Sequence, residues 1–114
     1  MDDIKDKYNT SIELALELIG GKWKMIILWH LSKGTKRFNE LRKLLPNITQ
    51  KMLTQQLREL EKDKLITRKV YAEVPPRVEY SSTKLGDDLQ NILIDISKWS
   101  NEYAEIHNIE IENY

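Results

Sequence analysis

A set of polar side chains between positions 50 and 58 is spaced so that its members share one face of a helix. The set consists of Gln50, Lys51, Thr54, Gln55 and Arg58. Glutamine can bond the edge of an adenine through two hydrogen bonds, and arginine or lysine can bond a guanine or a phosphate. These residues therefore have the chemistry of DNA recognition. The alternative is a solvated polar face on a helix whose other face, with Leu53, Leu57 and Leu60, packs in the core.

The residues just ahead of this set predict how its helix begins. Thr49 is suited to be the N-cap, because a threonine hydroxyl can accept a hydrogen bond from a free amide of the first turn. Ile48 and Leu53 have the spacing of a hydrophobic staple, which fixes the angle at which the chain enters the helix. Pro46 and Asn47 supply a turn. The order predicts a helix-turn-helix over residues 39–62, which places its second helix in the major groove of DNA.

Three helices are predicted before that turn. Thr10 begins a capping box for a helix over residues 11–19, which is apolar on two faces. Residues 22–33 form a second helix with an almost wholly apolar centre. Residues 35–37 are expected to form a basic turn, and Asn39 is the expected N-cap of the third helix. A short helix that is apolar on two faces needs two packing partners, and a second copy of the chain can be one of them.

Residues 66–82 have the pattern of a β-hairpin, with β-branched and aromatic residues on either side of a Pro-Pro pair. The prolines favour a stiff, extended tip. Tyr71 and Tyr80 are expected to pair across the two strands. Arg77 and Lys69, on opposing strands, are expected to contact phosphate or the minor groove. The sequence therefore predicts a wing that follows the helix-turn-helix.

Thr83 caps a last predicted helix over residues 83–106. At ~1.5 Å per residue this helix spans ~36 Å, whereas a compact domain of similar length has a radius of gyration of ~13 Å. The helix should therefore overhang the core, and its apolar stripe continues into the overhang. A second copy of the chain would cover that stripe. The predicted homodimer interface consists of Ile12, Leu16, Leu89, Ile92, Leu93, Ile96, Trp99 and Tyr103.

Charge is segregated along the chain. Residues 22–77 hold 14 Lys or Arg and five Asp or Glu, whereas the flanks hold four and 13, and the formal net charge is zero. A basic middle between acidic ends suits a protein that presents one face to phosphate. The N-terminal sequence is acidic and lacks the apolar run of a signal peptide, and no apolar run approaches a membrane span, so a cytoplasmic protein is expected.

No pattern in the chain supports catalysis or a cofactor. The 114 residues are predicted to form one domain, and they contain no cysteine, which excludes disulfides, thiol chemistry and cysteine-based metal sites. Neither His30 nor His107 has a metal-ligating partner at a suitable spacing, so no metal site is expected. Trp23, Trp29 and Trp99 could line a pocket for a small-molecule effector, but core or interface positions are the simpler expectation.

Four sequence motifs, LIGGKW (18–23), GTKRFNELR (34–42), ITQKMLTQQLRELE (48–61) and VPPRVEYSSTKLG (74–86), resemble those of the HxlR-type family of winged-helix transcriptional regulators, which are related to MarR. The resemblance covers residues 10–100. It implies a mainly α fold with a small β-hairpin, in which a winged helix-turn-helix lies between N- and C-terminal dimerisation helices. Two departures from the family stand out: Thr10 lies where some members carry a sensing cysteine, and Lys64 lies in a turn that often carries glycine.

The resemblance and the residues together predict a homodimeric regulator that binds a pseudo-palindromic site on double-stranded DNA. Its effector, if one exists, is not identified by the sequence. Two alternatives are a winged-helix module that docks a protein rather than DNA, and a DNA-binding protein without an effector. The predicted DNA contacts are Thr49, Gln50, Lys51, Thr54, Gln55, Arg58, Arg77, Lys69, Arg37 and Lys36.

Overall fold

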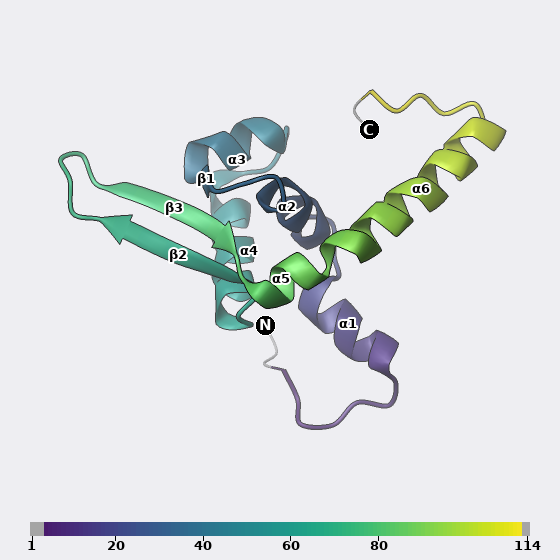
Figure 1. The fold of residues 1–114 in the computed structure, drawn as a ribbon, viewed down its shortest axis with the longest axis horizontal. Helices are drawn as coiled ribbons and strands as arrows, with labels where there is room; N and C mark the ends of the chain where they lie inside the picture. Colours follow the sequence, from purple (N-terminus) through teal and green to yellow (C-terminus); the bar gives the residue numbers. More distant parts are fainter. Residues whose placement is uncertain (1–3, 113–114) are drawn as a thin grey trace.

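The computed structural model describes residues 4–112, which form helices around a small antiparallel sheet (Figure 1). The elements in chain order are α1 (Ser11–Ile19), α2 (Lys24–Leu31), β1 (Lys36–Arg37), α3 (Phe38–Leu44), α4 (Gln50–Lys62), β2 (Ile66–Tyr71), β3 (Arg77–Ser82), α5 (Lys84–Asp88) and α6 (Gln90–Ile106). The sheet has the order β1-β3-β2. The predicted fold class, a mainly α winged helix-turn-helix with a small hairpin, is confirmed.

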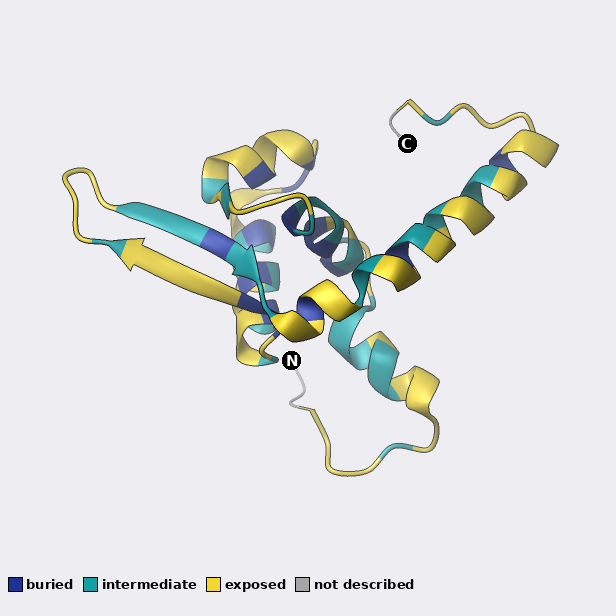
Figure 2. Ribbon diagram, viewed as in Figure 1, coloured by how far each residue is buried: buried dark blue, intermediate teal, exposed yellow. Residues whose placement is uncertain are grey.

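The core lies where α2, α3 and α4 meet the base of the sheet, and it is built mainly of leucine and isoleucine (Figure 2). Leu53, Leu57 and Leu60 are at most 1% exposed, which confirms the predicted core face of α4. Ile48 and Leu53 are both buried, as a hydrophobic staple requires. The β2–β3 hairpin and α6 extend from opposite sides of this body (Figure 1). The molecule is accordingly elongated, with extents of 51 × 39 × 25 Å.

Hydroxyl caps begin three of the helices, as the sequence predicts. At α1, the Glu13 amide donates to Thr10 Oγ1 (3.2 Å) and the Thr10 amide donates to the Glu13 carboxylate (2.8 Å), which completes a capping box. The Met52 amide donates to Thr49 Oγ1 (3.0 Å) at the start of α4. At α5, Thr83 Oγ1 accepts from the Gly86 amide (3.3 Å). These local bonds satisfy amides that would otherwise lack a partner within the helix.

The start of α3 differs from the prediction. The expected basic turn at residues 35–37 instead contains β1, whose Lys36 and Arg37 pair with Tyr80 and Glu79 of β3. This pairing keeps the backbone extended as far as Arg37, which is therefore the N-cap in place of Asn39. The Arg37 amide donates to the Glu40 carboxylate (2.8 Å). The prediction was wrong because a long-range strand pairing determines where the helix begins.

The sequence predicts one continuous C-terminal helix over residues 83–106, and this prediction is wrong. The structure has two helices there, α5 and α6, with an interruption at Leu89. Gly86 is buried, and a Cβ there would collide with the carbonyl oxygen of Leu65, so the backbone of α5 packs directly against the chain at the start of β2. The Leu89 amide then bonds to the Gly86 carbonyl (3.2 Å) in a tighter turn. This turn redirects the chain before α6 extends outward.

His30 gives the fold a testable pH dependence. It lies in α2, and burial together with the positive charges of Lys36 and Lys33 lowers its pKa below the usual 6.5. As pH falls, the unfolded chain binds this proton first, so the free energy of unfolding should decrease between about pH 7.5 and about pH 5. His30→Gln should flatten this decrease, as measured by urea unfolding at the two pH values. An identical pH dependence in both proteins would contradict the assignment.

Candidate nucleic-acid interface

Helix α4 has two faces of opposite character. Opposite its buried leucines, Gln50, Lys51, Gln55 and Arg58 are exposed and Thr54 is partly exposed. All five line one shallow surface depression, together with Glu59 and Lys62. The predicted polar set is therefore brought together on the solvent side of a helix that the core holds on its other side. Its side chains supply donors and acceptors of the kinds that read base edges and bind phosphate.

The first turn of α4 adds a second feature that suits an anionic partner. Thr49 is exposed, and its hydroxyl oxygen accepts the Met52 amide, which leaves the hydroxyl hydrogen able to donate. The N-terminal end of a helix carries a partial positive charge from its aligned peptide dipoles. Lys51 lies in the same turn and is exposed. The start of α4 is therefore electrostatically suited to lie beside a phosphate.

The two wing residues predicted to bind DNA have different surroundings. Lys69 is exposed and its ammonium lies 4.8 Å from the centre of the Tyr71 ring. Arg77 is partly buried: its guanidinium lies 3.2 Å from the Glu73 carboxylate, 3.9 Å from Glu79 and 3.9 Å from the centre of the Tyr71 ring. Arg77 therefore already has two anionic partners, and a phosphate would compete with them for its guanidinium.

Strand register explains these contacts, which the sequence pattern did not predict. Tyr71 lies opposite Arg77, and Lys69 lies opposite Glu79. Tyr80 is instead buried and lies opposite Arg68, so the expected pairing of Tyr71 with Tyr80 is wrong. The length of the loop between β2 and β3 determines this register. The loop is irregular, so no turn rule predicts from the sequence where each strand ends. The sequence did contain a signal for the ion pairs of Arg77, because Glu79 and Glu73 lie two and four positions from it.

Lys36 and Arg37 lie beside the wing rather than beside α4, because β1 is an edge strand paired with β3. Arg37 is exposed, and Lys36 Nζ donates to the carbonyl of Gly34 (3.2 Å). If the wing approaches DNA, these two cations approach with it. Their position suits contacts with the backbone of DNA, which orient a protein without reading sequence.

The apolar surface predicted for a homodimer is present on α1 and α6. Trp99 and Leu16 are 68% and 61% exposed, and Ile12, Ile92, Ile96 and Tyr103 are exposed as well. Leu93 is an exception, since it is 6% exposed and belongs to the core of its own chain, and Leu89 packs against the same core. In the single chain these two residues therefore face the body, and their place in a dimer interface stays a prediction. The remaining six are exposed apolar residues on α1 and α6, of the kind that mediate association.

Comparisons with known proteins agree with this geometry. The family model of the HxlR-like helix-turn-helix matches residues 18–108. The uncharacterized HTH-type transcriptional regulator YtcD of Bacillus subtilis is 59% identical over 95 residues, which are 83% of this chain and 75% of that protein. None of the helices within residues 4–112 is long and apolar enough to span a membrane.

Solved structures show the same fold. The redox regulator HypR in its reduced form has a TM-score of 0.82 at 46% identity, covering 89% of this chain and all of that one (100%). The reduced transcriptional regulator YodB of B. subtilis has a TM-score of 0.73 at 34% identity, covering 87% of this chain and 97% of that one. These relatives are regulators by name, and the fold that they share with this chain extends over most of its length.

Proposed function

This chain belongs to the HxlR-like helix-turn-helix family, and we propose that it is a homodimeric, sequence-specific DNA-binding regulator of transcription. The observation that supports this most directly is the two-faced α4. Three leucines anchor the helix, and five polar side chains with base-reading chemistry lie on its opposite, exposed side. In this proposal α4 is the recognition helix and the β2–β3 hairpin is the wing.

Gln55→Ala tests whether α4 reads bases. Because an alanine cannot form the paired hydrogen bonds to an adenine edge, the variant should lose ~1–3 kcal/mol of discrimination at one base pair of the site. The measurement is the affinity for every single-base variant of the operator. The matched control is Glu61→Ala, an exposed position of α4 outside the polar set. Equal weakening on operator and random DNA would contradict a base-reading role.

Arg77→Ala tests the wing. If the guanidinium exchanges a carboxylate for a DNA phosphate, its removal should reduce the slope of log affinity against log salt by about 1 while leaving sequence preference unchanged. The slope is measured with the same duplex at several salt concentrations. An unchanged slope would indicate that Arg77 only braces the hairpin through Glu73, Glu79 and Tyr71.

A homodimer follows from the uncovered apolar surface of α1 and α6. Two-fold symmetry would present two recognition helices to successive major grooves, which requires half-sites ~34–36 Å apart. The site should therefore be a pseudo-palindrome. Regulation would come from an effector that changes the spacing of the two recognition helices across the α6 helices. HypR is a redox regulator by name, but this chain contains no cysteine, so its regulation cannot use a thiol.

A further inference from the structure

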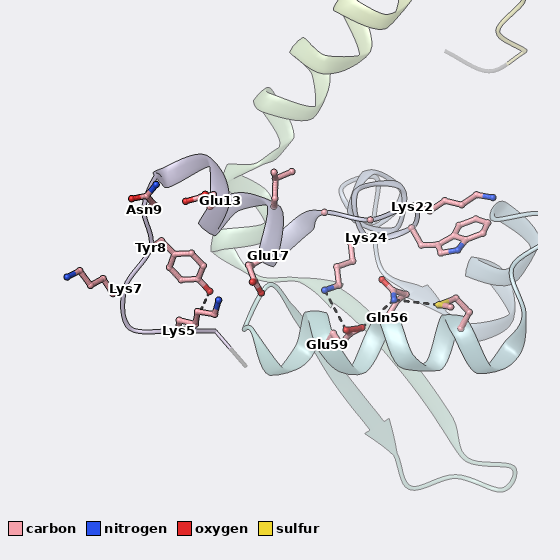
Figure 3. Close-up of a pocket in the computed structure, with 15 residues that line it drawn as sticks. Lys5, Lys7, Tyr8, Asn9, Glu13, Glu17, Lys22, Lys24, Gln56 and Glu59 are labelled. Carbon is pink, nitrogen blue, oxygen red and sulfur yellow. Dashed lines mark hydrogen bonds and ion pairs between the residues drawn. The ribbon is translucent and has the colours of Figure 1, made fainter. Parts of the chain in front are cut away.

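A pocket of about 920 Å³ lies along one flank of the recognition helix (Figure 3), and Glu59 lines both this pocket and the depression on the face proposed to read DNA. Its walls come from residues 5–9, from α1, from the turn between α1 and α2, and from the flank of α4. Leu16, Trp23 and Met52 contribute apolar surface to it. Ten of its fifteen lining residues are polar or charged, and its volume lies in the range of small-molecule sites.

A buried but incomplete ion pair lies in this pocket. Lys24 Nζ is 3.8 Å from Glu59 Oε1, and the two side chains are only 7% and 11% exposed. This distance exceeds that of a hydrogen bond, so the contact is an ion pair without direct hydrogen bonding. An ammonium has three donors, so the Lys24 ammonium can bond to a ligand as well as face Glu59. A ligand group placed between the two charges would supply the missing bonds.

The charges around the pocket indicate what that ligand is. Four lysines and three glutamates line it, so cationic and anionic side chains are nearly balanced. A simple anion would meet Lys24 but be repelled by Glu59 and Glu17, and a simple cation would meet the opposite conflict. A molecule with both charges satisfies both sets. We propose that the pocket binds a small zwitterion with an apolar body, of the kind represented by a free amino acid.

The position of the pocket gives such a ligand a route to DNA binding. Gln56 and Glu59 belong to α4, and the Gln56 amide nitrogen donates to Glu59 Oε2 (3.3 Å) and lies 3.6 Å from the sulfur of Met52. They directly follow Gln55 and Arg58, which lie on the proposed DNA face. A ligand bonded to Lys24 and Glu59 would therefore fix α4 against α2. This coupling rests on the proposed DNA-binding function, whereas the binding of the zwitterion does not.

The binding test uses sets of probes that share an apolar body and differ in charge. Phenylalanine, leucine and methionine are each compared with the carboxylic acid that lacks the amino group and with the amine that lacks the carboxylate. Calorimetry on the whole protein without DNA should show at least one amino acid binding about tenfold or more tighter than both of its analogues. The site proposal is overturned if no amino acid shows this preference.

Variants assign the binding to this pocket. Glu59→Gln and Lys24→Met should each weaken it by about tenfold or more, because each removes the side chain that would pair with one charge of the zwitterion. Glu17→Gln, at a partly exposed position of α1, is a second variant that does not disturb the buried pair and should also weaken binding. Glu61→Gln is the control, because it lies on α4 outside the pocket. Unchanged binding in both Glu17→Gln and Glu59→Gln would place the ligand elsewhere and overturn the proposal.

Operator binding then tests the coupling separately. The zwitterion should change operator affinity, and the operator should change zwitterion affinity by the same factor. If the zwitterion binds and the operator affinity does not change, the regulatory role is overturned and the site stands. If the protein binds no DNA at all, the proposed function fails, and the calorimetric result still decides whether the pocket is a zwitterion site.

Discussion

Replacing Leu57 with alanine is expected to lower the free energy of unfolding by about 2–5 kcal/mol. Leu57 is 1% exposed and lies between Leu53 and Leu60 on the core face of α4. Its truncation removes apolar contact and leaves a cavity that the surrounding helices can fill only in part. A domain with a typical stability of about 5–15 kcal/mol would lose a large fraction of it. Urea unfolding monitored by tryptophan fluorescence measures the change.

The neighbouring position provides the matched control. Arg58 is exposed on the opposite face of α4, so Arg58→Ala should change the free energy of unfolding by no more than about 0.5 kcal/mol. It should nevertheless weaken DNA binding. If one face of α4 anchors the helix and the other reads DNA, substitutions on the first face should lower stability and substitutions on the second should weaken DNA binding. Equal effects of the two substitutions on stability would contradict it.

Replacing Trp99 with aspartate is expected to convert a homodimer into monomers. Trp99 is 68% exposed in the single chain and its ring lies 6.4 Å from that of Tyr103, so the two aromatic residues form the centre of the apolar surface of α6. A carboxylate buried in such an interface without a partner costs several kcal/mol. The dimer dissociation constant should therefore rise by about 100-fold or more, and operator affinity should fall because one monomer contacts only one half-site.

Analytical ultracentrifugation over a range of protein concentrations measures this change. Val74→Asp, at the fully exposed tip of the wing, is the control for adding a carboxylate to exposed apolar surface, and it should leave the mass unchanged. A monomeric wild-type protein, or a Trp99→Asp variant that dimerises as well as the wild type, would show that α6 does not form the interface.

Features that depend on neighbouring residues could be predicted from the sequence. The caps at Thr10, Thr49 and Thr83 depend on side chains that reach amides three residues away, and all three were predicted correctly. The two faces of α4 follow from its leucine spacing. The family's usual glycine after α4 marks a left-handed turn, and Lys64 indeed has a φ of 64° there.

Features that depend on tertiary packing could not be predicted. β1 exists only because β3 pairs with it, and it moves the start of α3. The break at Leu89 follows from the close approach of Gly86 to Leu65, which no local pattern reveals. Lys24 looks like a solvated residue at the start of an apolar helix, yet it is 5% exposed and faces Glu59, 35 positions away in the chain. Of the residues that line the candidate effector pocket, the sequence therefore pointed only to Trp23.

The central claim is that the polar face of α4 gives sequence-specific DNA binding. The most direct test is the salt dependence of binding to a duplex from the upstream region of the protein's own gene, measured beside a scrambled duplex of equal composition. We expect a steep salt slope on both duplexes, from counterion release at the basic face, and much tighter binding to the upstream duplex. Absence of salt-dependent binding to either duplex would contradict the claim and favour a protein-docking role for the domain.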